Sequence, residues 1–402
     1  MRNCAVRSVL LGALSGLGFF CSAAAQTESV IVNFGLHRGR YPDASLLMDA
    51  SGHLFATTEL GGMRGHYAGG KFGTVAELTR SGRRWHTTVL QTFDLETGGF
   101  PTAALIPSPK GTLYGTTSLG GNDGCGMVFE LEPQNGIWTE TVLHNFAYGG
   151  DGCVPNGELV RDAGGNLYGV TAIGGAHSSG MVFQLTKNKT GWLESDLYNF
   201  TGGADGNRPR SLLMDATGTI YGTASEGGAN SEGVVFQLAN SNGNWTETVL
   251  HSFGGDGDGT GSPYGALAKD PAGNLYGTTI NGGEDGQGSV FELSPSNGGW
   301  SAATLYSFTG GADGENPEDG VSLASGALYG TTSRGGASGG GTVFELTNPN
   351  GTWMETVLHS FSGGSDGSLP YARPIVDKSG TIFGTTVDGG KHARGVAYEI
   401  TP

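Results

Sequence analysis

Three short blocks that combine apolar residues with small or polar ones return along the whole chain. The first reads Tyr-Gly-Thr-Thr, the second reads Val-Phe-Glu-Leu, and the third, seen as TVLHSF at 248–253, ends in phenylalanine. Each block, with its variants, occurs seven times, and successive copies lie 53 to 59 residues apart. Self-similarity at a fixed period predicts a repeat architecture. The first block starts at Phe55, Tyr114, Tyr168, Tyr221, Tyr276, Tyr329 and Phe383, the second starts at Val75, Val128, Val182, Val235, Val290, Val343 and Ala397, and the third ends at Phe34, Phe93, Phe146, Phe200, Phe253, Phe308 and Phe361.

Each repeat predicts four short antiparallel strands. The first strand follows a proline-containing loop, as at 211–215, and the blocks Tyr-Gly-Thr-Thr and Val-Phe-Glu-Leu form the second and third. The fourth ends in the repeated phenylalanine, and every tryptophan of the chain lies eight residues before one of these phenylalanines. A D-x-x-G-N turn, as at 270–274, separates strands one and two, and an Asn-Gly turn, as at 350–351, often separates strands three and four. Short, evenly spaced strands without helical periodicity predict an all-β protein.

The second and third strands are apolar on both alternating faces, as Val343, Phe344 and Leu346 illustrate. A single exposed sheet would alternate apolar and polar residues, so burial on both faces indicates sheets stacked against neighbours on both sides. The blades of a propeller are stacked in this way, whereas the repeats of a β-helix are much shorter. We therefore predict one seven-bladed β-propeller over residues 26–402, built from seven repeats of about 54 residues.

The ends of the chain predict how the ring closes. Residues 29–34, SVIVNF, match a fourth strand, and the chain ends at Pro402, directly after the third strand of the seventh repeat. We expect the N-terminal strand to complete the last blade, since this pairing removes two exposed sheet edges. We expect no further domain and no C-terminal anchor.

The first 25 residues read as a signal peptide. Arg2 and Arg7 precede an apolar run over 9–20, and small residues at 22–25 predict cleavage near Ala25/Gln26. The apolar run is too short to span a bilayer comfortably, and we expect no membrane span. These features predict a secreted or periplasmic protein.

Composition narrows the possible partners. Glycine accounts for 76 of 402 residues, and its fixed positions between apolar blocks indicate turns between strands. After removal of the signal peptide, 19 basic residues face 37 acidic ones, a net charge of −18 that disfavours nucleic acid as a partner. Cys125 and Cys153 are the cysteines that remain, and an oxidising compartment favours their pairing in a disulfide. No nucleophile elbow, HExxH motif or Walker loop occurs, and we predict no cofactor.

The blocks NLYGTT at 274–279 and G-x-VFEL at 288–293 resemble the repeat of the choice-of-anchor tandem repeat GloVer-containing proteins. The resemblance covers residues 29–401 and repeats seven times. It implies an extracytoplasmic location, often with a C-terminal anchoring signal, although this chain stops at its last predicted strand. The resemblance brings no established activity and no catalytic residues.

Two series of polar residues recur in the repeats, and each series occupies its own fixed position relative to the repeated phenylalanine. Aspartates lie five residues after the repeated phenylalanine, where they could ring a channel mouth and bind calcium. A requirement of the turn itself explains the repetition better, since aspartate side chains cap such turns. The same argument assigns a structural role to the histidines of strand four, which share their register with Tyr198 and Tyr306. The first series comprises Asp151, Asp205, Asp258, Asp313 and Asp366, and the second comprises His144, His251 and His359.

Departures from the repeat concentrate in the first and last repeats, where basic and aromatic residues gather in an otherwise acidic chain. One interpretation is that the repeats at the closure have drifted and form local ion pairs. The other is an anion-binding site, in which basic groups bind carboxylates and aromatic rings stack on sugars. The ligand-binding candidates are Arg38, Arg40, Arg64, Lys71, Tyr371, Arg373, Lys391, His392 and Arg394, and the catalytic candidates are His37, Tyr41, His66 and Tyr67.

Three hypotheses about function follow. The first is a monomeric recognition module for glycans, with anionic polysaccharide or another extracellular protein as partner. The second is a polyuronate lyase, in which a tyrosine or histidine takes the proton while Arg40, Arg373 and Arg394 stabilise the charge. The third is a structural surface protein without a small ligand. The sequence does not decide whether the protein is an enzyme.

Overall fold

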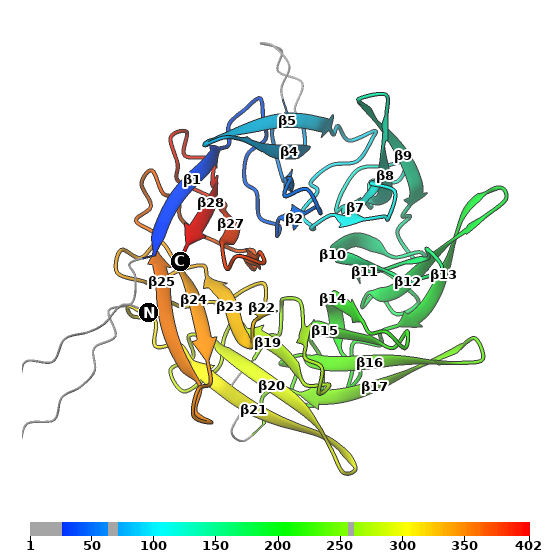
Figure 1. Cartoon of the computed structure of the whole chain (residues 1–402). Helices are drawn as coiled ribbons and strands as arrows, with labels where there is room; N and C mark the ends of the chain where they lie inside the picture. Colours follow the sequence, from blue (N-terminus) through cyan, green and yellow to red (C-terminus); the bar gives the residue numbers. More distant parts are fainter. Residues whose placement is uncertain (1–25, 63–70, 256–260) are drawn as a thin grey trace, which may run out of the picture.

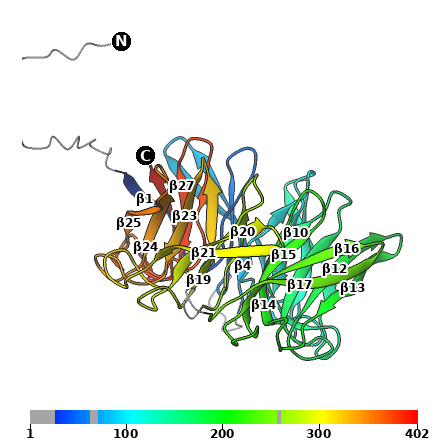
Figure 2. The same ribbon diagram turned by 90° about the horizontal axis from the view of Figure 1, so that it is seen from below.

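The computed structural model of the protein describes residues 26–62, 71–255 and 261–402. Within these residues all regular structure is β-strand, and the strands form seven separate four-stranded antiparallel sheets. The sheets are arranged as blades around a central axis (Figure 1), and the view turned by 90° shows them standing side by side (Figure 2). No helix that could span a membrane occurs in the part of the chain that the structure describes. The predicted all-β, seven-bladed propeller is confirmed.

The first three blades contain twelve strands, each blade running from the axis to the rim in chain order. Blade 1 contains β2 (Leu47–Met48), β3 (Leu54–Thr58), β4 (Thr74–Ser81) and β5 (Arg84–Thr92). Blade 2 contains β6 (Ile106–Pro107), β7 (Leu113–Thr117), β8 (Met127–Gln134) and β9 (Ile137–Asn145). Blade 3 contains β10 (Cys153–Arg161), β11 (Leu167–Ile173), β12 (Met181–Asn188) and β13 (Gly191–Asn199).

The remaining blades follow the same order, except that the outer strand of blade 7 comes from the start of the chain. Blade 4 contains β14 (Asn207–Met214), β15 (Ile220–Glu226), β16 (Val234–Ser241) and β17 (Asn244–Ser252). Blade 5 contains β18 (Ala268–Lys269), β19 (Leu275–Thr279), β20 (Ser289–Ser296) and β21 (Gly299–Ser307). Blade 6 contains β22 (Val321–Ala324), β23 (Ala327–Thr332), β24 (Thr342–Thr347) and β25 (Met354–Ser360), and blade 7 contains β26 (Ile375–Val376), β27 (Ile382–Thr386), β28 (Val396–Thr401) and β1 (Thr27–Asn33).

The ring closes through β1, as the sequence predicted. β1 pairs antiparallel with β28, from Thr27 opposite Thr401 to Asn33 opposite Val396. Phe34 follows directly, is fully buried, and donates its backbone N–H to the carbonyl of Gly395 at 3.1 Å. Figure 1 shows β1 beside β28, close to the C-terminus. The first and last described segments of the chain therefore form one sheet.

The repeated aromatic residues form the contacts between neighbouring blades. The phenylalanine that ends the fourth strand packs against the aromatic ring in the third strand of the next blade, as Phe200 and Phe236 do at 5.1 Å between ring centroids. The ring that starts the second strand meets the tryptophan of the next blade edge to face, as Tyr168 and Trp245 do. Because β1 carries no tryptophan, Tyr329 of blade 6 has no such partner in blade 7. The aromatic residues that recur in the sequence thus make recurring contacts between blades.

Candidate functional site

A pocket of about 450 Å³ lies on the propeller axis and receives side chains from all seven blades. In six blades the residue before the inter-blade proline has a positive φ, and in these six its N–H donates to a carbonyl of the preceding blade, as Val154 donates to Cys125 at 2.9 Å. In these six blades the contact holds the residue after the proline in place beside the pocket. That position is not repeated in sequence: it is occupied by Asp43, Thr102, Asn156, Arg210, Tyr264, Glu318 and Tyr371, all of which line the pocket.

An ion pair across the ring forms the centre of the pocket. Arg373 of blade 7 contacts Glu158 of blade 3, with Nη2 and Oε2 2.7 Å apart. Asp319 of blade 6 accepts hydrogen bonds from the hydroxyl of Ser45 at 3.0 Å and from the backbone N–H of Arg373 at 3.1 Å. Burial raises the pKa of Glu158, although the positive charge of Arg373 counteracts this shift. Four blades are therefore linked at one polar centre.

Two oxygens of the pocket lack a hydrogen-bond donor among the residues that the structure describes. They are Asp43 Oδ1 and Asn156 Oδ1, and both atoms are inaccessible to solvent. Burial raises the pKa of Asp43 well above its usual value, and the negative charges of Glu59 and Asp319 raise it further. Buried acceptors are almost always paired, so these two oxygens call for donors from water or from a ligand.

Another part of the pocket wall consists of the planar side chains of Arg210 and Tyr264. The guanidinium of Arg210 lies 3.8 Å from the centroid of the Tyr264 ring, and its Nε donates to the hydroxyl of Ser225 at 3.0 Å. A second cavity of about 530 Å³ shares Ser45, Glu158 and Arg373 with the pocket and is otherwise lined mostly by apolar side chains of the first strands. The pocket thus combines acceptors, donors and aromatic faces at the mouth of a largely apolar channel.

The structure divides the candidates that the sequence placed in blades 1 and 7. Tyr371 and Arg373 line the axial pocket, whereas the other described candidates are not among its lining residues. Lys71 pairs with Asp94 at 3.2 Å, and the Arg40 guanidinium lies 5.4 Å from the centroid of the Tyr41 ring. The loops of blades 1 and 7 outside the pocket, here called the rim, carry the exposed residues His37, Arg38, Lys391 and His392 and the partly buried Arg394. Arg64, His66 and Tyr67 lie outside the described residues.

Several pocket residues escaped the sequence analysis, among them Asn156, Glu158, Arg210, Tyr264 and Asp319. A signal for most of them was present, because the position after each inter-blade proline varies while its flanks repeat. Glu158 and Asp319 carried no such signal, because acidic residues are frequent in this chain, at 37 against 21 basic ones.

The predicted disulfide is confirmed. Cys125 lies in the loop between β7 and β8, and Cys153 begins β10, with their Cα atoms 4.7 Å apart. The bond joins blade 2 to blade 3 at the loop that leads into the new blade.

The repeated aspartate of the inter-blade loop caps its own turn. Asp205 Oδ2 accepts the N–H of Thr201 at 2.7 Å and the hydroxyl of Tyr198 at 3.0 Å. This geometry supports the turn interpretation of the series. The equivalent backbone contact is made by Asp151, Asp313 and Asp366, whereas Asp258 lies outside the described residues.

A glutamate of the next blade faces this aspartate at several junctions, and it predicts an unusual pH dependence. Burial and the charge of Asp205 raise the pKa of Glu247 to about 7, and burial and the charge of Asp313 raise that of Glu355 to about 7. Because the folded state holds these protons more tightly than the unfolded chain, their stabilising contribution is complete below about pH 4.5 and is lost as the pH rises through 7.

We therefore expect the double variant Glu247→Gln, Glu355→Gln to lose less stability than the wild type between pH 5 and pH 8. Denaturant unfolding at the two pH values measures the difference, and Glu284→Gln, at an exposed loop position, is the matched control. Equal losses in the double variant and the wild type would show that the two glutamates titrate normally.

Among the solved structures that match this chain, two illustrate the shared fold at low sequence identity. The extracellular domain of a candidate hybrid two-component system from B. thetaiotaomicron matches with a TM-score of 0.58 and 13% identity, over 94% of this chain and 42% of its own. A candidate 6-phosphogluconolactonase from Bacteroides uniformis matches with a TM-score of 0.52 and 12% identity, over 78% and 83%. This chain therefore spans less than half of the first protein. At such identities the likeness shows the fold alone.

The sequence itself matches a family of repeats. No protein of curated function matches this chain. The model of the Gloeobacter/Verrucomicrobia repeat matches residues 12–236 and 210–402, which together span the propeller and bear out the resemblance of the repeated blocks. This chain is a member of the Gloeobacter/Verrucomicrobia repeat family.

Proposed function

We propose that this protein is an extracytoplasmic recognition module that binds a carbohydrate in the axial pocket. The observation that carries the proposal is the convergence of seven non-repeating side chains on one pocket of an otherwise repetitive ring. The repeated residues are sufficient for the fold. At this position only two of the seven blades share a residue type, so we infer that it has a role other than the packing of blades. The signal peptide expected at residues 1–25 supports a location outside the cytoplasm.

The chemistry of the pocket suits a polyhydroxylated ligand. Its volume falls in the range of small-molecule sites, which is roughly 300–1,000 Å³. The carboxyl group of Asp43 and the amide group of Asn156 line the pocket and can form hydrogen bonds with sugar hydroxyls, while the rings of Tyr264 and Tyr371 offer faces for stacking. A sugar supplies both donors and an apolar face.

The charge of the pocket favours neutral or amino sugars over uronates. Asp43, Glu158, Glu318 and Asp319 line it against two arginines, and Arg373 already pairs with Glu158. A uronate carboxylate would enter beside these acidic groups at a cost. Binding of anionic polysaccharide at the exposed rim of blades 1 and 7 remains a separate hypothesis, with Arg38, Lys391 and His392 as its residues.

Calorimetric titration of the chain from Gln26 with neutral, amino and uronate oligosaccharides tests the proposal. We expect a neutral or amino sugar to bind, and Tyr264→Ala and Asp43→Ala to weaken it roughly 10- to 100-fold, because a stacking face and a buried acceptor are lost. The control Lys391→Ala changes the rim and leaves the pocket intact.

The same experiment separates the other hypotheses. Equal binding in Tyr264→Ala, Asp43→Ala and the wild type would exclude the axial pocket, and binding of uronates that depends on Lys391 would favour the rim. Formation of unsaturated products from a polyuronate would favour the lyase. Absence of binding to every glycan would favour the structural module.

A further inference from the structure

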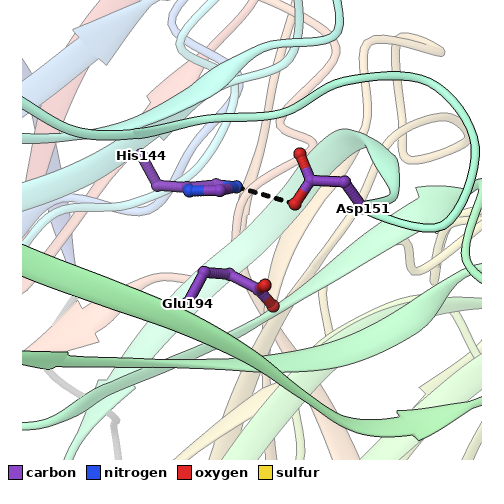
Figure 3. Close-up of side chains that lie close together, drawn as sticks. All are labelled: His144, Asp151 and Glu194. Carbon is purple, nitrogen blue, oxygen red and sulfur yellow. Dashed lines mark hydrogen bonds and ion pairs between the residues drawn. The ribbon is translucent and has the colours of Figure 1, made fainter.

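The junction between blades 2 and 3 carries a cluster of side chains that the axial pocket does not involve. His144 lies in β9, Asp151 in the loop that leads to β10, and Glu194 in β13 of the next blade. The potential ligand atoms of the three residues lie within 4.8 Å of one another, and His144 Nε2 is 3.0 Å from Asp151 Oδ1. Figure 3 shows the imidazole and both carboxylates directed toward one another. Two neighbouring blades thus contribute to one small polar site.

Asp151 differs from three of its counterparts. In their loops a hydroxyl donates to the Oδ1 atom, as Thr201 does at Asp205, Thr309 at Asp313 and Ser362 at Asp366. Ala147 stands at this position in blade 2, so it supplies only its backbone N–H, to Oδ2 at 2.7 Å. The hydrogen bond that the structure gives to Asp151 Oδ1 is the one with His144. Oδ1 of this carboxylate therefore has no hydroxyl partner, and its contact is with the ring nitrogen of His144, which is itself a potential metal ligand.

The glutamate side of the site departs from the repeat at a neighbouring residue. Glu194 Oε1 is inaccessible to solvent and has no hydrogen-bond donor among the described residues, and the same holds for the equivalent atoms of Glu140, Glu247 and Glu355. Two residues further on, Asp196 stands where five other repeats have valine and the sixth has Thr304. The disulfide at Cys153 ties the Asp151 loop to the loop of Cys125 in blade 2. Three changes from the repeat, namely Ala147, Asp196 and the disulfide, meet at this one junction, beside a histidine–aspartate pair that blade 6 also has.

We propose that His144, Asp151 and Glu194 bind a divalent transition-metal ion that links blade 2 to blade 3. One imidazole nitrogen and two carboxylate oxygens form a donor set that suits zinc, which accepts both ligand types at about 2.0–2.2 Å. The metal supplies the positive partner that Glu194 Oε1 lacks among the described residues, and it takes the place of the hydrogen bond between His144 and Asp151 Oδ1. The site is independent of the axial pocket and of any carbohydrate bound there.

The ring contains matched junctions for comparison. At the next junction Tyr198 replaces the histidine and donates its hydroxyl to Asp205 at 3.0 Å, an arrangement with no nitrogen ligand. At the junction of blades 6 and 7, His359 lies 3.5 Å from Asp366, but Ser362 occupies Asp366 Oδ1. The variant His144→Tyr therefore recreates a natural junction, and His359→Tyr is its control.

The test is calorimetric titration of zinc chloride into the metal-free chain from Gln26, with a thermal melt of each variant. We expect one strong zinc site in the wild type and an increase of the melting temperature with zinc. His144→Tyr and Glu194→Gln are each expected to weaken that site at least about 100-fold, since even outer-shell changes weaken metal sites 10- to 100-fold. His359→Tyr is expected to leave it unchanged.

Three results would overturn the proposal: no zinc site in the folded wild type, full zinc affinity in His144→Tyr, or equal loss in His359→Tyr. A melt without zinc shows whether each variant is folded, and Glu194→Gln provides a second, nearly isosteric change if His144→Tyr unfolds. A site that binds calcium and not zinc would exclude an imidazole ligand and would equally contradict the proposal.

Discussion

A chain that begins at Gly35 in place of Gln26 is expected to lose cooperative folding. Without β1, the edge of β28 loses the pairing that runs from Thr27 to Asn33, and the buried side chains of Val32 and Phe34 leave the core. Loss of one buried phenylalanine costs about 3–5 kcal/mol, and the whole stability of a domain is about 5–15 kcal/mol. Circular dichroism melts and size-exclusion chromatography of the two chains measure the effect, which we expect to include association through the exposed edge.

Point variants and a peptide show whether the effect comes from the closure itself. Phe34→Ala is expected to lower the melting temperature strongly, whereas Thr27→Ala, at an exposed position of the same strand, should change it little. A peptide of residues 26–34 added to the shortened chain is expected to restore folding, because it can pair with β28 as the native strand does. A shortened chain that melts like the longer one would show that β1 is dispensable.

The second large effect concerns the glycine that faces an aromatic ring in six blades. A Cβ at Gly330 would lie 2.3 Å from Cζ of Phe344, its partner across the β23–β24 pair. Blade 1 has Ala56 opposite Ala76 at the equivalent positions, so both residues change together there. We therefore expect Gly330→Ala to cost about 1–3 kcal/mol from overpacking and Phe344→Ala to cost about 3–5 kcal/mol from the cavity.

The double variant Gly330→Ala, Phe344→Ala is expected to be about as stable as Phe344→Ala alone, because the added methyl group then meets no ring. Denaturant unfolding of the four proteins gives the coupling energy directly. Gly299→Ala is the control, since a Cβ at Gly299 meets nothing within 4 Å. Additive costs in the double variant would show that the glycine is not required by the ring opposite it.

The sequence alone determined the architecture of this protein. The tryptophan and phenylalanine of the fourth strand recur because they contact aromatic rings of a neighbouring blade, and the glycine of the second strand recurs because it faces the aromatic ring of the third strand in its own blade. A contact repeated in space leaves a period in the chain, and the period can be read without coordinates. The match of residues 29–34 to a fourth strand likewise predicted the closure. The seventh repeat lacks a fourth strand of its own, and its pairing with the N-terminal strand removes the exposed edges of both.

Only the tertiary structure decided which non-repeating residues meet. Glu158 and Arg373 are 215 residues apart, and their ion pair exists because two blades on different sides of the ring direct these side chains to one axis. The sequence singled out Arg373 as one of several basic ligand-binding candidates of the first and last repeats, and only the structure places it beside Glu158 in the axial pocket. His144, Asp151 and Glu194 likewise come from two blades. A periodic signal records contacts that every repeat shares, and it carries no information on contacts made only once.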